Sequence, residues 1–130
     1  MPTELQLLQK EEIGGLASII ASILLVVSSL EGQEDILAKE NNAEPPNRPV
    51  SSGEVSLDSS LVFILSALIY AYTTYARYDE RRKNPPEGSG PEYYQPEGIV
   101  FYGSLVILIG YIILTEGTKL ELERDQPVVI

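Results

Sequence analysis

Three long uncharged segments dominate the hydrophobic pattern of the chain. They cover residues 13–30 (IGGLASIIASILLVVSSL), 59–76 (SSLVFILSALIYAYTTYA) and 98–115 (GIVFYGSLVILIGYIILT), and all charged side chains lie outside them. A helix of about 18 residues is about 27 Å long, close to the roughly 30 Å hydrocarbon core of a bilayer. Because a helix in water carries charge on its exposed face, the pattern predicts an all-α integral membrane protein with three transmembrane helices.

The residues around these segments predict helices that extend past the bilayer. Thr3 and Gln6 have the spacing of a capping box, so the first helix is expected to begin near Thr3. The pair Pro85-Pro86 ends the second helix. The predicted single membrane domain, residues 1–130, is an antiparallel bundle divided as follows: transmembrane helix about 13–30, acidic loop 31–58, transmembrane helix about 59–76 with a helical extension to about 83, Pro/Gly loop 84–95, and transmembrane helix about 98–115 with an extension to about 124.

Small residues recur along one side of each predicted span. In lipid the hydrophobic effect does not drive helices together, and small residues that let two backbones approach are the usual contact surface. In the first span they share a sector of about 100°, and in the other two they are seven residues apart, a spacing that keeps one groove facing a neighbour. The predicted helix-packing residues are Gly14, Ser18, Ser22, Ser60, Ala67, Thr74, Gly103, Gly110 and Gly117, in contact within the chain or with another subunit.

Tyrosines and basic residues gather around the end of the second span, in YAYTTYARYDERRK (residues 70–83). The tyrosine rings spread over more than half of the helix circumference, which is typical of a girdle at a membrane surface and not of a pocket. The predicted membrane-interface anchors are Tyr72, Tyr75, Tyr78, Arg77, Arg81, Arg82, Lys83, Tyr93, Tyr94 and Tyr102. Arg77 and Arg81, which align with Thr74 and Tyr70, are also candidates to meet a lipid phosphate or a partner's carboxylate.

The basic cluster also predicts an orientation. Arg77, Arg81, Arg82 and Lys83 directly follow the second span, whereas Lys39 and Arg48 lie far from either membrane edge. Cytoplasmic flanks collect lysine and arginine. The amino terminus and the second loop are therefore predicted to be cytoplasmic, and the first loop and the carboxyl terminus to lie outside.

Composition limits the chemistry that the chain can perform. The net charge is -10, and cysteine and histidine are both absent. This excludes thiolate and imidazole chemistry, and the acidic first loop does not attract nucleic acid. The paired acids Glu11-Glu12 and Glu34-Asp35 are sequence neighbours that point about 100° apart on a helix, so neither pair forms a catalytic dyad. We expect no enzymatic activity, no catalytic residue, no cofactor, no metal site and no nucleic-acid partner.

The leading hypothesis is a non-catalytic membrane protein that acts by packing against lipid, other membrane subunits or copies of itself, as an accessory or structural subunit of a larger complex or as a homo-oligomer. In length and three-span layout the chain also resembles phage holins of the three-span type, which implies membrane permeabilisation as the alternative. Those holins have a basic cytoplasmic tail, whereas this chain ends in the mildly acidic TEGTKLELERDQPVVI. A transporter or channel subunit with a pore between copies is a third hypothesis.

Overall fold

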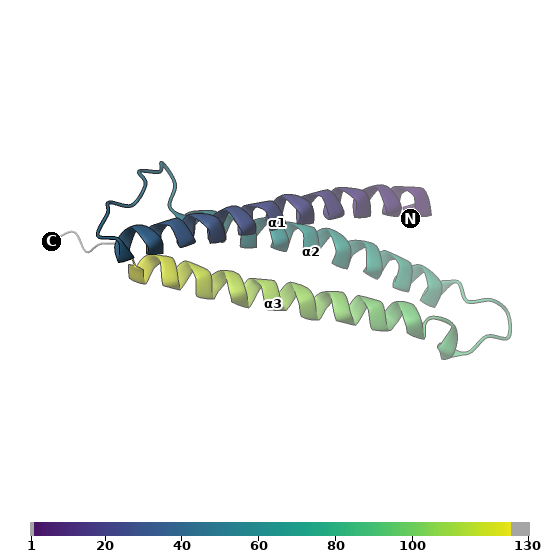
Figure 1. Ribbon diagram of the computed structural model, residues 1–130. Coiled ribbons are helices and arrows are strands. Elements are labelled where there is room, and N and C mark those ends of the chain that lie inside the picture. The colour runs from purple at the N-terminus through teal and green to yellow at the C-terminus, as the bar shows by residue number, and fades with distance from the viewer. Residues whose placement is uncertain (1, 126–130) are drawn as a thin grey trace.

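A computed structural model describes residues 2–125, and this part of the chain is helical apart from its connections (Figure 1). Helix α1 spans Glu4–Glu40, α2 spans Ser52–Lys83 and α3 spans Gln95–Asp125, with a 3-10 turn, η1, at Pro91–Tyr93. Each of the three α-helices is long and apolar enough to cross a membrane. The all-α class and the three long apolar helices agree with the sequence-based expectation.

Helix α1 begins as predicted but extends further than predicted. The Thr3 hydroxyl accepts a hydrogen bond from the Gln6 backbone N–H at 3.2 Å, and the Thr3 N–H donates to the Gln6 side chain at 2.9 Å. The predicted loop at 31–58 is wrong at its start, because α1 continues to Glu40. Residues 31–40 (EGQEDILAKE) are mostly good helix formers. The helix ends where Asn42 adopts a φ of 53°, a conformation that asparagine tolerates.

The other boundaries follow local capping rules. Helix α2 begins at Ser52, before the predicted start at 59, because the Ser51 hydroxyl accepts a hydrogen bond from the Glu54 N–H at 3.2 Å. The first connection is therefore limited to residues 41–51. The predicted extension of α2 to Lys83 is confirmed, and α3 reaches Asp125. The second connection, expected to be irregular up to residue 95, contains the turn η1.

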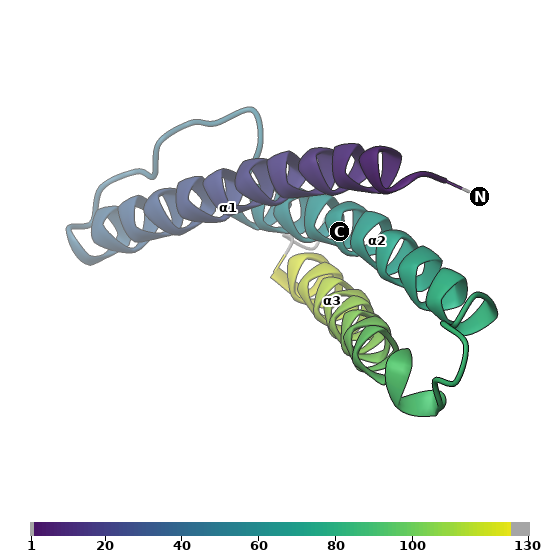
Figure 2. The same ribbon diagram turned by 90° about the vertical axis from the view of Figure 1, so that its right-hand side faces the viewer.

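Helix α2 is the central element. Within the described residues, α1 and α3 each pack on α2 and not on each other, and both views place α2 between them (Figures 1 and 2). The start of α1 and the connection between α2 and α3 lie at one end of the structure, on the right in Figure 1. We call it the Arg77 end. The opposite end, with residues 41–51 and the end of α3, is the Arg48 end.

Most buried apolar side chains are small, and most large aliphatic side chains point outward. The buried apolar side chains are Leu7, Ala17, Ala21, Ala67, Ala71 and Ala76. In contrast, most isoleucines and leucines of the spans are half exposed or more; Ile23 of α1 is 57% exposed and Ile113 of α3 is 67% exposed. Monomeric soluble proteins rarely expose contiguous apolar surface of this extent. The packing positions small and polar groups where the helices meet, and these contacts form the candidate site.

Candidate functional site

Serine hydroxyls hold α1 against α2. Ser59 donates to the Ala21 carbonyl at 2.7 Å, and Ser66 lies 2.8 Å from the Gly14 carbonyl and 2.5 Å from the Ser18 hydroxyl. A Cβ built on Gly14 would lie 3.3 Å from Ile69 Cγ2. Because glycine has no Cβ, α1 can lie this close to Ile69 of α2. Close backbones and interhelical hydroxyl bonds are the usual means of helix association in lipid.

Aromatic rings hold α3 against α2. Phe101 of α3 lies 5.2 Å from the Tyr75 ring and 6.0 Å from the Tyr78 ring, centre to centre. Gly98 gives Tyr78 its space, since a Cβ on Gly98 would lie 3.0 Å from Tyr78 Cε2. Further along, Phe63 stacks on Tyr111 at 5.1 Å. Such ring pairs contribute stability beyond the area they bury.

The helix-packing residues predicted in α1 and α2 mostly lie at these contacts. Gly14, Ala67 and Thr74 are buried, and Thr74 hydrogen-bonds Ser104 of α3 at 2.9 Å. Ser18 is half buried beside Ser66. Ser60 is buried, but its hydroxyl donates to the Ser56 carbonyl of its own helix. Ser22 is exposed, so its role in a contact stays a prediction.

The glycine row of α3 faces open space within the described residues. Gly103, Gly110 and Gly117 are exposed, and a Cβ built on each would meet nothing within 4 Å. The side of α3 that faces α2 carries Phe101 and Ser104 instead. At about 100° per residue, Gly103 lies about 200° from Phe101. The row therefore lies on the side of α3 away from α2.

Arg77 joins α1 to α2 at the Arg77 end. Its guanidinium contacts the carboxylates of Glu11 and Glu4, the latter at 2.8 Å. The hydrogen bond from Arg77 lowers the pKa of Glu11, and the bonds to Glu11 and Glu4 raise the pKa of Arg77. The carboxylates that Arg77 contacts belong to the same chain. A contact of Arg77 with a lipid phosphate or with a partner's carboxylate stays a prediction.

The other predicted anchors divide into paired and exposed side chains. Arg81 donates to the Tyr93 hydroxyl at 3.0 Å, and both Arg82 and Lys83 pair with Asp79, at 2.8 and 2.9 Å. The bond from Lys83 is the main cause of the lowered pKa of Asp79. The exposed rings are Tyr72, Tyr75 and Tyr102, whereas Tyr78, Tyr93 and Tyr94 are half buried. Whether they anchor the chain at a membrane surface stays a prediction.

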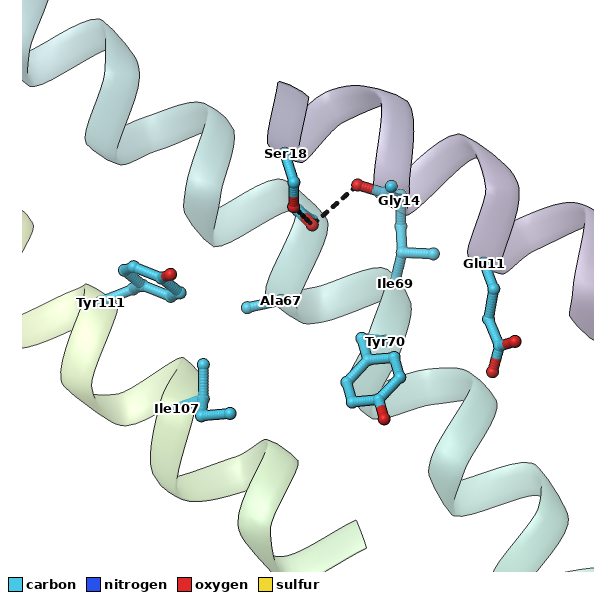
Figure 3. A pocket seen from close by; sticks show the side chains of 10 residues that line it. Glu11, Gly14, Ser18, Ala67, Ile69, Tyr70, Ile107 and Tyr111 are labelled. Atoms are coloured by element: carbon cyan, nitrogen blue, oxygen red, sulfur yellow. Dashed lines mark hydrogen bonds between the residues drawn. The ribbon is translucent and has the colours of Figure 1, made fainter. Parts of the chain in front are cut away.

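A groove runs along α2 between α1 and α3 (Figure 3). Its volume is about 390 Å³, and all three helices line it. Ala67 and Tyr70 of α2 form its floor. Gly15 and Ser18 of α1 lie on one side, and Ile107 and Tyr111 of α3 lie on the other. The groove exists because α1 and α3 both pack on α2 but, within the described residues, not on each other.

Several contact residues were not predicted from the sequence. Arg77 binds Glu4 and Glu11, which precede it by 73 and 66 residues, and no local pattern indicates such partners. A signal did exist for the α1-facing side of α2, because its hydroxyl residues are seven apart. They are Ser52, Ser59, Ser66 and Thr73, one residue before the predicted row of Ser60, Ala67 and Thr74.

Comparison of the chain with protein families, with characterised proteins and with solved structures found no match. The geometry of the helix contacts, the exposed glycine row and the groove therefore carries the functional interpretation.

Proposed function

We propose that the chain is an integral membrane protein whose three helices cross the bilayer as an antiparallel bundle. It acts without catalysis, by packing against other helices, as an accessory or structural subunit of a larger membrane complex or as a homo-oligomer. The half-exposed isoleucines and leucines support the membrane setting, because each of these side chains gains about 1.5–3 kcal/mol on leaving water. Few of them find that burial within the chain.

The observation that carries the proposal is the exposed glycine row of α3. A glycine inside a helix costs about 1 kcal/mol relative to alanine. Gly98 offsets this cost through its close approach to Tyr78, but a Cβ built on Gly103, Gly110 or Gly117 would meet nothing within 4 Å. The row lies beside exposed branched side chains such as Val106 and Ile113. A smooth glycine groove between branched ridges suits close approach of a helix from another chain.

The orientation belongs to the same proposal. Arg81, Arg82 and Lys83 lie at the Arg77 end, beside the exposed connection that contains Ser89. Lysine and arginine favour the cytoplasmic side. The amino terminus and this connection are therefore cytoplasmic. Because the chain has no cysteine, Ser89→Cys gives a single labelling site, and modification by an impermeant reagent outside intact cells would reverse this orientation.

Blue-native electrophoresis in mild detergent tests the packing function. We expect a particle larger than the monomer that shrinks when Gly103→Leu and Gly110→Leu are combined. Gly32→Leu is the control, because Gly32 also meets nothing within 4 Å but lies outside the uncharged segments. A strictly monomeric particle that the double substitution leaves unchanged would disprove the proposal.

Inducible expression in a bacterium with a membrane-potential dye tests the alternative, permeabilisation, which the holin resemblance implies. A permeabilising protein abolishes the membrane potential, whereas a protein that acts by packing leaves it intact.

A further inference from the structure

The groove between α1 and α3 adjoins a second cavity toward the Arg77 end. The second cavity has a volume of about 180 Å³, and Tyr70 lines both. Thr74 and Arg77 follow Tyr70 on α2 and line the second cavity, together with Glu97 and Val100 of α3. The two cavities therefore adjoin at Tyr70, and together they follow α2 from Ala67 to Arg77; we treat the pair as one candidate space.

The space is apolar along most of its length and charged at one end. Its apolar part lies within the uncharged segments, where it meets Ala67, Ile107 and Tyr111. At the other end each helix contributes a charged residue from just beyond its uncharged segment: Glu11 from α1, Arg77 from α2 and Glu97 from α3. This polarity along the helix axis matches that of an amphiphile whose headgroup lies at the membrane surface.

The charges at this end are not balanced. Among the residues that line the space, two carboxylates, those of Glu11 and Glu97, face one guanidinium group, that of Arg77, which leaves one net negative charge. Arg81 lies only loosely against Glu97, at 3.8 Å from Oε1. The other oxygen, Glu97 Oε2, is buried and has no hydrogen-bond donor among the described residues. An unsatisfied buried acceptor of this kind is costly. The Glu97 side chain as a whole is 28% exposed, so a donor from another molecule can reach its carboxylate.

We infer that the space binds a phospholipid whose headgroup carries a primary ammonium. The ammonium donates to Glu97 and the phosphate lies toward Arg77, while an acyl chain follows Tyr70, Ala67 and Ile107 along the groove. This inference rests on the proposed membrane insertion. A volume of about 390 Å³ falls in the range of small-molecule sites, roughly 300–1,000 Å³.

The net negative charge at the charged end of the space determines which lipid headgroup binds there. A headgroup with net negative charge is repelled by the excess carboxylate. A quaternary ammonium carries the required charge but has no N–H to donate, whereas a primary ammonium has three. Phosphatidylethanolamine is therefore preferred to phosphatidylcholine and to phosphatidylglycerol.

Native mass spectrometry of the purified full chain, exchanged into equal mixtures of these three lipids, tests the inference. We expect phosphatidylethanolamine to be retained about tenfold over phosphatidylglycerol, the size of one hydrogen bond to a charged group. Glu97→Gln should abolish this preference. Gly15→Leu should reduce retention of all three lipids, because Gly15 lines the groove and its Cβ would meet nothing within 4 Å, so the variant can fold. Gly32→Leu, which is outside the groove, is the matched control.

Two results would overturn the inference. Equal retention of the three lipids by the unmodified chain would contradict selection by the headgroup. Retention that Gly15→Leu leaves unchanged would show that lipid binds elsewhere. Extraction of membranes with alkaline carbonate, done first, tests the proposed membrane insertion separately. If carbonate releases the chain, the membrane insertion is wrong; if the chain stays in the membrane, the lipid experiment tests the lipid site alone.

Discussion

Helix α2 contacts its two neighbours through opposite kinds of surface. Against α1 it presents serines and a backbone close enough that Gly14 approaches Ile69, and hydroxyls such as Ser59 donate to backbone carbonyls. Against α3 it presents aromatic rings, with Tyr78 beside Phe101 and over Gly98. The first contact depends on small size and the second on large, rigid rings.

This difference explains how α2 holds α1 and α3 by two separate kinds of contact. Hydroxyl-to-carbonyl bonds fix the register of α1 at several depths, because each donor reaches one carbonyl. The rings concentrate their contacts near the Arg77 end, where Tyr78, Tyr94 and Phe101 meet. Substitutions should therefore act differently on the two contacts, and four experiments compare them in order of expected effect.

A large side chain at position 14 should destabilise the α1–α2 contact more than any other change tested. Gly14→Leu places a branched side chain where a Cβ alone would lie 3.3 Å from Ile69, and we expect a loss of about 3 kcal/mol in the free energy of unfolding. Unfolding by SDS from mild-detergent micelles, followed by circular dichroism, measures it. Gly15→Leu is the matched control, because its Cβ would meet nothing within 4 Å. Equal losses in the two variants would refute the close contact at Gly14.

One methyl group should disturb the α2–α3 contact. Gly98→Ala puts a Cβ 3.0 Å from Tyr78 Cε2, and we expect a loss of about 1–2 kcal/mol in the same assay. Gly103→Ala on the open side of α3 should be neutral or slightly stabilising, because alanine favours helix. In a chain that already carries Tyr78→Ala, Gly98→Ala should no longer lower the free energy of unfolding. A cost that persists without the ring would place the clash elsewhere.

The Arg77 ion cluster should add a pH dependence to the α1–α2 contact alone. The pKa of Glu11 is lowered in the fold, so its contribution is present above the unfolded value of about 4.5 and is lost as the pH falls through the folded pKa. We expect Glu11→Gln to cost about 1 kcal/mol at neutral pH and to weaken the acid dependence. Glu12→Gln, at an exposed neighbouring position, is the control. An unchanged acid profile in Glu11→Gln would contradict this assignment.

Removal of a single hydroxyl should lower the free energy of unfolding least. Ser59→Ala and Ser66→Ala each remove one interhelical donor, and hydrogen bonds between membrane helices are worth about 0.6 kcal/mol on average. Thr74→Val removes the bond to Ser104 while keeping the side-chain shape. Exposed Ser29→Ala on α1 is the reference. If Thr74→Val costs more than both serine variants together, the α2–α3 contact depends on its hydroxyl pair and not chiefly on its rings.

The local sequence was enough to predict most of the helices. Uncharged segments predicted three long apolar helices, the capping box at Thr3 located the first helix start, and the Pro85-Pro86 pair limited α2 to Lys83. These features are local, because helix length and capping depend on residues within a few turns. The continuation of α1 to Glu40 was missed because local composition permits either helix or loop there, and Arg48 contacts Glu34 and Asp35 only once the chain turns back.

Which helix faces meet could not be predicted from the local sequence. Gly14 and Gly103 both belong to rows of small residues, yet the first is buried against α2 and the second is exposed. A row of small residues permits close approach, but it does not specify the neighbour, because rotation and register depend on all contacts of the helix at once. The same reason explains why Glu4 and Glu11 were not foreseen as partners of Arg77, and why the groove beside Ala67 exists where, within the described residues, α1 and α3 both pack on α2 but not on each other.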